Sequence, residues 1–274
     1  MNKFIYRYEA MNTPCELILF HHSKSQADNV ANTILLETKR LEKKYNYYDS
    51  NSFLNQLNTR KIQELDNETK TILQRTKRYY KLTNKIFDIT IATIKELYNS
   101  NSNEHKLKEQ IQLLRPYIGC EHFTIQRNKL KFDNNYTKID LGGFVKEYAV
   151  DRAVTILQKY KIFSGIINYG GDIYALGRKP NGSKFTIAIK DPINRDNFIT
   201  EVSLENEALT TSASYERNYK IGSKIFSHII QKDEYPHTPN SVTVISPNCV
   251  ESGIFSTSLM VDRNLYTKHK TIIV

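Results

Sequence analysis

KIDLGGFVKEYAVDRAVTILQKY, residues 138–160, is the stretch that decides the fold class of this chain. Its first residues have the pattern of a short strand, and the adjacent Gly142 and Gly143 predict a tight turn. Beyond the glycines, apolar residues recur at the period of an α-helix as far as about residue 160. The stretch therefore predicts a strand, a glycine turn and an amphipathic helix in direct succession.

Patterns on either side predict both strands and helices. β-Branched and aromatic residues predict strands at 4–10, 15–20, 163–168, 173–177, 184–190, 199–204, 220–226, 241–246 and 271–274. Helical periodicity predicts helices at 25–45, 67–82, 90–98 and 252–261. Alternation around Arg127-Asn128 predicts a β-hairpin over 122–133. These elements neither alternate strictly nor repeat at a fixed period, so we predict an α+β fold.

Composition places the chain among globular proteins. It has 274 residues, of which 39% are hydrophobic and 25% charged, and this excludes a disordered chain. At this length we expect one unit spanning residues 1–274, built as a large domain or as two closely joined lobes.

The net charge of +10 is dispersed along the sequence. The densest basic segment, TKRLEKKYNYY at 38–48, mixes Glu with Lys at a helical period, which is typical of a solvated helix face. We therefore predict no nucleic-acid partner, and a nucleic-acid-binding function would rest on charge alone.

The apolar runs are far shorter than the 18 or so residues of a membrane span, so no span is predicted. The first 13 residues carry neither the apolar core nor the cleavage site of an export signal. Cys15, Cys120 and Cys249 are odd in number and have no metal-binding spacing, which suits a reducing compartment. We expect a cytoplasmic protein.

Two glycine pairs stand beside acidic residues, at 140–143 (Asp-Leu-Gly-Gly) and at 168–172 (Asn-Tyr-Gly-Gly-Asp). Glycine lets the backbone approach a ligand closely, and amides at a helix N-terminus favour negative charge. The first pair, with Lys146 one turn into the helix, therefore predicts a phosphate cradle. The alternative is that both pairs are ordinary tight turns.

The order of the motifs carries a resemblance to a known family. DLGGFVKEYAVD (140–151) is followed by INYGGDIYALG (167–177), LTTSASYERNY (209–219), SHII (227–230) and SVTVISPNCVESGIFSTSL (241–259). Upstream are EAMNT (9–13), YDSNSFLNQLN (48–58) and TNKIFDIT (83–90). From about residue 9 to 261 the chain resembles the ApbE family of FAD:protein FMN transferases.

The resemblance implies an ApbE-like α+β fold, with mixed or antiparallel sheets, flanking helices and FAD between two closely joined lobes. It implies an enzyme that splits FAD at its diphosphate and joins FMN to a Thr or Ser hydroxyl of a target flavoprotein, releasing AMP. The partners would be FAD and that target protein. Mg²⁺ on the diphosphate would neutralise charge that grows in the transition state.

The resemblance also implies site residues. The catalytic residues would be Lys146, Asp140 and His228. The FAD site would be lined by Met11, Tyr48, Ile86, Phe87, Asp88, Asp140, Gly142, Gly143, Lys146, Gly170, Gly171, Asp172 and Ile229. The metal would be held at Gly143 through its main-chain oxygen, at Thr257 and at position Gly253. Two alternatives stay open: Asp172 braces its own turn, and His228 is a partly buried core histidine.

Several positions depart from the family pattern. The family's metal-binding Asp is Gly253 here, which removes the carboxylate of the predicted metal site and leaves Glu251 as a replacement to be considered. Family glycines are replaced at Asn12, Lys85 and Ala213. Two hypotheses follow: a divergent flavin transferase, or a catalytically impaired FAD-binding or flavin-trafficking paralogue.

Overall fold

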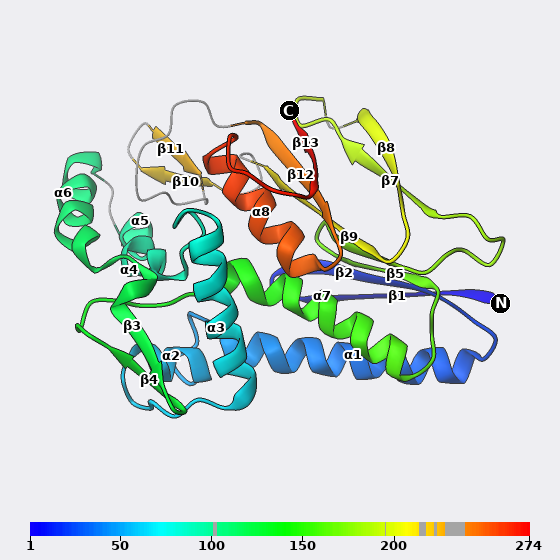
Figure 1. Ribbon diagram of the computed structural model, residues 1–274, viewed down its shortest axis with the longest axis horizontal. Helices are drawn as coiled ribbons and strands as arrows, with labels where there is room; N and C mark the ends of the chain where they lie inside the picture. The colour runs from blue at the N-terminus through cyan, green and yellow to red at the C-terminus, as the bar shows by residue number, and fades with distance from the viewer. Residues whose placement is uncertain (101–102, 195, 214–217, 222–223, 228–238) are drawn as a thin grey trace.

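A computed structural model describes residues 1–274 except 101–102, 195, 214–217, 222–223 and 228–238. Within these residues seven antiparallel strands form the main sheet, in the order β1-β2-β5-β6-β9-β12-β13 (Figure 1). Their bounds are β1 Asn2–Ala10, β2 Thr13–His21, β5 Gly165–Tyr169, β6 Asp172–Leu176, β9 Glu207–Ala213, β12 Ser241–Ser246 and β13 Lys270–Ile273.

Two-stranded hairpins lie outside the main sheet. They are β3 Phe123–Gln126 with β4 Lys129–Phe132, β7 Phe185–Lys190 with β8 Phe198–Leu204, and β10 Asn218–Ile221 with β11 Lys224–Ser227. The first hairpin turns at Arg127, whose φ of 55° suits a tight two-residue turn, so the hairpin predicted over 122–133 is confirmed.

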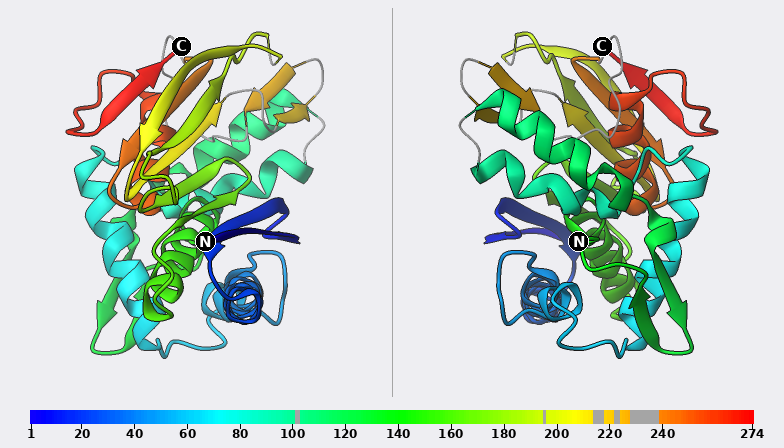
Figure 2. Two further views of the ribbon diagram at one scale, coloured as in Figure 1. Left: turned by 90° about the vertical axis from the view of Figure 1, so that its right-hand side faces the viewer. Right: turned by 90° about the vertical axis from the view of Figure 1, so that its left-hand side faces the viewer.

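Three long helices cover one face of the main sheet (Figures 1 and 2). They are α1 Lys24–Tyr45, α7 Gly142–Lys159 and α8 Cys249–Val261. A fourth long helix, α3 Asn67–Leu82, has the bounds that the sequence predicted. The shorter elements are α2 Phe53–Asn58, α4 Ala92–Lys95, α5 Leu97–Ser100, α6 Glu104–Leu114 and 3₁₀ turns at Ile89–Ile91, Arg115–Tyr117 and Cys120–His122.

Alternation along the strands divides the buried side chains between the two faces of the sheet. Leu17 and Ile167 belong to the main core, which the sheet shares with α1 and α7. Leu209 faces the other way and packs with Phe185 and Leu204 of the β7–β8 hairpin. The sheet is therefore covered by helices on one face and by a hairpin on the other, which confirms the α+β prediction.

Local capping sets where the helices begin. Ser23, Asp66 and Asn248 each accept a hydrogen bond from a backbone N–H of the first turn of α1, α3 and α8. Helix α8 begins three residues before the predicted residue 252, because Asn248 caps it and Glu251 stands three residues later. This is a capping-box pattern that periodicity alone does not reveal.

Some elements of the structure were not predicted, and some predicted elements were wrong. Helices α2 and α6 and strand β9 were not predicted; β9 was missed because its sequence, EALTTSA, has Thr and Ser where large apolar residues would indicate a strand. The predicted helix at 90–98 is broken into shorter pieces, since Asp88 caps a 3₁₀ turn at Ile89–Ile91. The strand predicted at 220–226 is split between β10 and β11.

The chain entering α7 is not a strand, although the sequence predicted one there. The buried side chain of Asn58 pairs with both backbone groups of Ile139: its Nδ2 donates to the carbonyl at 2.8 Å, and its Oδ1 accepts from the N–H at 2.8 Å. One amide side chain thus replaces a neighbouring strand. It ties the end of α2 to the glycine turn.

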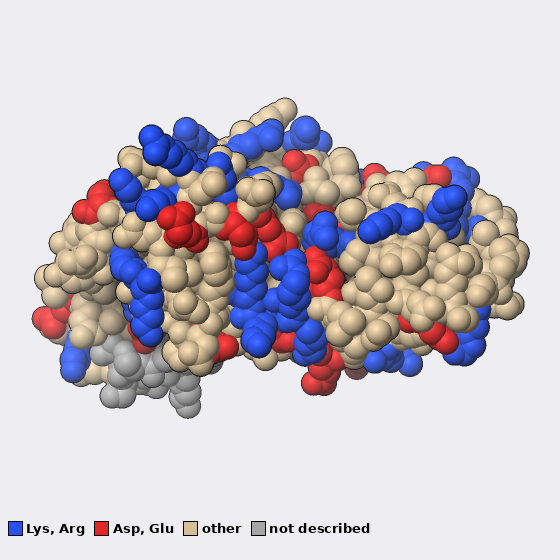
Figure 3. Space-filling model, turned by 90° about the horizontal axis from the view of Figure 1, so that it is seen from below, with Lys and Arg blue, Asp and Glu red and all other residues tan. Residues whose placement is uncertain are grey.

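Charged side chains of both signs are mixed on the surface, as the dispersed charge along the sequence predicts. On the face shown in Figure 3, Lys and Arg side chains are interspersed with Asp and Glu. The three cysteines are buried and free. No helix of the described residues is long and apolar enough to cross a bilayer.

Replacing Asn58 by Ala should lower the free energy of unfolding by about 1 to 3 kcal/mol, because two buried backbone groups of Ile139 lose their partner. Urea denaturation measures this. Thr59→Ala is the matched control: it removes an exposed hydroxyl at the same helix end and should change stability by less than about 0.5 kcal/mol. Equal effects of the two substitutions would contradict this account of Asn58.

Candidate functional site

The Gly142-Gly143 turn forms the N-terminus of α7. Asp140 Oδ1 accepts a hydrogen bond from Gly142 N at 2.9 Å, and Gly143 has non-helical dihedral angles of φ −87° and ψ 16°. A Cβ at Gly143 would lie 3.7 Å from the ring of Phe87, so the turn packs closely against that ring. Phe87, which is predicted to line the FAD site, therefore lies beside the glycine turn.

Most amides of this first turn are already bonded. The N–H groups of Phe144 and Val145 both donate to the carbonyl of Leu141, and that of Gly142 donates to Asp140. Among the described residues, Gly143 N–H has no partner. The predicted phosphate cradle would therefore have this one free amide.

Asp140 also forms an ion pair that the sequence did not predict. Its Oδ2 lies 2.5 Å from Lys95 Nζ, and this ammonium lies 5.0 Å from the ring centroid of Tyr48. Burial favours the neutral amine, but the charge of Asp140 outweighs it and raises the pKa of Lys95. Asp140, Lys95 and the exposed Tyr48 thus form one group next to the glycine turn. No motif marks Lys95 because it stands alone in a helical segment.

Lys146 pairs with Asp172 Oδ2, and the side chain of Asp172 is only 3% exposed. Burial opposes the charged ammonium, but the nearby carboxylates of Asp172 and Glu147 outweigh it and raise the pKa of Lys146. The turn before Asp172 is braced by Asn168, whose Oδ1 accepts from Gly171 N at 2.9 Å. Asp172 therefore faces Lys146, while Asn168 braces the turn.

The Gly170-Gly171 turn lies against the turn between β1 and β2. Gly170 has a φ of +60°, and a Cβ there would lie 1.9 Å from Thr13 Oγ1, so only glycine fits. In the facing turn, Met11 N donates to Glu42 Oε1 at 2.5 Å. The two turns therefore meet at one end of the sheet.

A cavity of about 810 Å³ opens on the face of the sheet that Leu209 shares with the β7–β8 hairpin. It is lined in part by Tyr8, Cys15, Asn168, Gly170, Gly171 and Thr211. Of the described residues that are predicted to bind FAD, only the two glycines line it. The other described ones lie around the start of α7 or at the β1–β2 turn.

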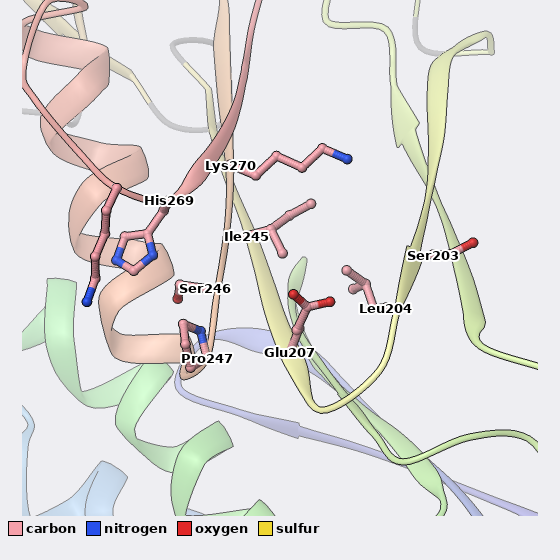
Figure 4. A pocket seen from close by; sticks show the side chains of 9 residues that line it. Ser203, Leu204, Glu207, Ile245, Ser246, Pro247, His269 and Lys270 are labelled. Carbon is pink, nitrogen blue, oxygen red and sulfur yellow. The ribbon is translucent and has the colours of Figure 1, made fainter.

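Another cavity, of about 420 Å³, lies near the turn that leads into α8 (Figure 4). Its lining includes Glu207, Ile245 and Lys270, and the Glu207 carboxylate points into the space while Ser203 points away. None of the predicted site residues that the structure describes lines this cavity.

Helices α7 and α8 lie in contact, and Asp151 fixes how they align. Its carboxylate accepts from Cys249 N at 2.7 Å and from Val250 N at 3.2 Å, at the N-terminus of α8. Burial raises the pKa of Asp151 to about 6, although the two N–H donors favour the charged form. One turn nearer the start of α7, Glu147 lies against Gly253.

The predicted metal ligands lie on these two helices. Thr257 Oγ1 is 3.1 Å from Ser212 Oγ on β9, and Gly253 offers no side chain. Glu251, the replacement considered from the sequence, lies 3.5 Å from both Tyr79 and His269 and is thus engaged elsewhere. Among the described residues no three His, Cys, Asp or Glu side chains are grouped so as to hold a metal. The predicted ligands thus offer a cation a main-chain oxygen at Gly143 and a hydroxyl at Thr257.

Comparison with known proteins identifies the family. The model of the ApbE family matches residues 11–266. The chain belongs to the ApbE family.

Curated relatives are FAD:protein FMN transferases. The protein from Escherichia coli K12 is 26% identical over 65% of this chain and 54% of its own length. That from Buchnera aphidicola is 31% identical over 66% of this chain and 56% of its own length. The matched part of the chain thus spans little more than half the length of these relatives.

Solved structures show the same fold. The ApbE protein from Thermotoga maritima superimposes with a TM-score of 0.90 at 26% identity, covering 100% of this chain and 94% of that one. The flavin transferase ApbE from Vibrio cholerae gives a TM-score of 0.82 at 20% identity, covering 99% and 97%. The ApbE-like fold with antiparallel sheets and flanking helices is therefore confirmed.

Two departures from the ApbE-family glycines lie at left-handed backbone positions. Asn12 has a φ of 57° and Lys85 a φ of 69°. Asn tolerates this region because its short side chain bonds locally, whereas Lys is disfavoured there. The backbone of both turns has thus kept a conformation that favours glycine.

The remaining predicted site residues are Asp88, Ile86, His228 and Ile229. Asp88 is directed to its own turn: its carboxylate accepts from both the N–H and the hydroxyl of Thr90. Ile86 packs against the buried cluster that contains Phe255 and Met260. His228 and Ile229 lie outside the described residues.

The pH dependence of stability should report the burial of Asp151. Its pKa in the folded state is about 6, above the 3.8 of a free Asp, so the folded protein keeps a proton that the unfolded chain releases between these values. The free energy of unfolding, relative to Asp151→Asn, should therefore fall as the pH rises from about 4 to 6 and then level off. Urea denaturation across this range measures it.

Asp28→Asn is the control for this series. Hydrogen bonds from Lys24 and then Tyr6 lower the pKa of Asp28, so stability relative to this variant should rise with pH in the acid range. The same slope for both variants would contradict the assignment.

Proposed function

We propose that this ApbE-family protein is an FAD:protein FMN transferase, which moves FMN from FAD to a Thr or Ser hydroxyl of a target flavoprotein and releases AMP. The observation that supports it best is the ion pair between the partly buried Lys146 and the buried Asp172, which joins the two glycine motifs at the start of α7. FAD would lie between two closely joined lobes of a single unit.

The residues around the turn have distinct parts in this proposal. The ammonium of Lys146, held by Asp172, would bind a phosphate oxygen of FAD as a fixed point charge. The free N–H of Gly143 would donate to the same diphosphate. Asp140 keeps the turn in shape through Gly142 and orients Lys95 toward Tyr48. These groups would hold the diphosphate still while the acceptor oxygen attacks phosphorus and AMP departs.

Mg²⁺, where bound, would neutralise charge that grows on the diphosphate. The main-chain oxygen of Gly143 and the hydroxyl of Thr257 fit such a hard cation. Gly253 does not fit it, since it has no side-chain oxygen. This single mismatch favours the second candidate function, a catalytically impaired FAD-binding or flavin-trafficking paralogue.

For the compartment we propose the cytoplasm, with the acceptor hydroxyl presented there and no nucleic acid or membrane span involved. The support is chemical, because three buried free thiols suit a reducing compartment. Fractionation of cells that express the native gene tests this, and protein in the periplasm would contradict it.

The two candidate functions are separated by one incubation. Purified protein is mixed with FAD, Mg²⁺ and peptides that carry a single Thr or Ser, and AMP is followed by chromatography and peptide mass by mass spectrometry. AMP together with a flavinylated peptide supports the transferase. Bound FAD without AMP supports the impaired paralogue.

Lys146→Ala should weaken FAD binding by about 1 to 3 kcal/mol, because the diphosphate loses a charge-assisted contact. Isothermal titration calorimetry measures it. Lys159→Ala, on the exposed last turn of the same helix, is the control and should leave the affinity unchanged. Equal FAD affinities of Lys146→Ala and the unmodified protein would refute the phosphate-binding role.

A further inference from the structure

Glu147 carries a buried carboxylate that its surroundings leave unsatisfied. The residue is 7% exposed, and Oε2 has no hydrogen-bond partner among the described residues. A buried carboxylate without a partner is costly in free energy, and a cation relieves that cost. The sequence pattern assigns no role to Glu147, because only the fold shows that this side chain is buried.

The side chain of Glu147 fills the space above Gly253. A Cβ built on Gly253 would lie 2.6 Å from Glu147 Cγ and 2.9 Å from Oε1, closer than non-bonded atoms approach. Any side chain at position 253 would have to displace Glu147. The side chain of Glu147 thus occupies the space into which a side chain at position 253 of α8 would project.

The alignment of the helices brings the other oxygen ligands near this point. Asp151 lies at Cys249 and Val250, and Glu147 lies at Gly253, so the helices run in opposite directions. Gly143 stands four residues before Glu147 on α7 and Thr257 four residues after Gly253 on α8, so both lie about one turn further toward the same end of this helix pair. The Glu147 carboxylate is therefore one turn from both.

The local charge favours a cation. Asp172, Asp151 and Lys146 all interact electrostatically with Glu147. The one ammonium is already paired with Asp172. A hard divalent cation would balance the remaining negative charge with oxygen ligands.

We propose that Glu147 of α7 supplies the carboxylate ligand of the divalent cation, at the place where Gly253 of α8 provides none. The inference rests on the proposed function for the presence of that cation beside the FAD diphosphate. Two oxygens come from Gly143 and Thr257 and the third from Glu147. Compared with the family pattern, the carboxylate ligand would thus come from α7 in place of α8, at the same point between the two helices.

The contact between Glu147 and Gly253 changes the expected effect of the Gly253→Asp substitution on cation binding. From the sequence alone, Gly253→Asp should restore a ligand. In the structure the new side chain collides with Glu147, so the single substitution should not strengthen cation binding. Only the exchange of both residues, Glu147→Gly with Gly253→Asp, returns the carboxylate to α8 without a clash.

Mn²⁺ binding to the FAD-loaded protein, followed by electron paramagnetic resonance of the free ion, tests the proposal directly. Glu147→Gln keeps the shape of the side chain and removes its charge, and should weaken Mn²⁺ binding by about tenfold or more. The double exchange should recover most of that loss. Glu251→Gln is the matched control on α8 and should bind Mn²⁺ as the unmodified protein does. Thermal unfolding and FAD binding establish that each variant is folded.

The outcomes separate the inference from the proposed function. Unchanged Mn²⁺ binding in folded Glu147→Gln, loss in Glu251→Gln instead, or no Mn²⁺ binding by the unmodified protein would overturn the inference. AMP release is measured on the same samples. Mn²⁺ binding that depends on Glu147 without any AMP release would uphold the inference and refute the transferase. AMP release together with Mn²⁺ binding that does not depend on Glu147 would uphold the transferase and overturn the inference.

Discussion

Two hydrogen bonds from the N-terminus of α8 to the carboxylate of Asp151 fix the alignment of α7 and α8. The positive end of the α8 dipole and two otherwise orphaned N–H groups meet a negative charge there. A slip of one turn, about 5.4 Å, would break this contact and move Glu147 away from Gly253. The whole candidate site depends on this alignment, since its residues are divided between the two helices.

Charge is held inside the layer between the helices and the sheet. Lys146 and Asp172 neutralise each other there, while burial and the charge of Asp172 raise the pKa of Glu147 to about 7. Such groups are poor contributors to stability, because desolvation cancels much of the Coulomb attraction. Their placement at the start of α7 instead suits the binding of an anionic diphosphate and its cation. The fold supports this cluster with apolar packing on both faces of the sheet.

At the turns around the site, the backbone conformation is constrained more strongly than the identity of the side chain. Gly170 is required because Thr13 leaves no room for a Cβ, and the facing turn is left-handed at Asn12 without glycine. Asn58 replaces a strand partner for Ile139 and leads the chain into the Gly142 turn. The position of the glycine motif thus depends on side chains distant in sequence.

The sequence by itself determined the family and most of the elements, because these follow from local patterns. Periodicity located α1 and α3, and the order of the motifs along the chain indicated the ApbE family. Strand β9 was not predicted, since Thr and Ser stand at positions where large apolar residues would indicate a strand, and only the neighbouring strands β6 and β12 define it.

Only the tertiary structure decided which residues meet. It paired Lys146 with Asp172 and Asp140 with Lys95, directed Asp88 to its own turn, and placed Glu147 against Gly253. A motif records spacing along one chain, whereas these contacts join segments up to about a hundred residues apart. The physical reason is that a buried charge takes its partner from whatever element packs against it, and packing is a property of the whole fold.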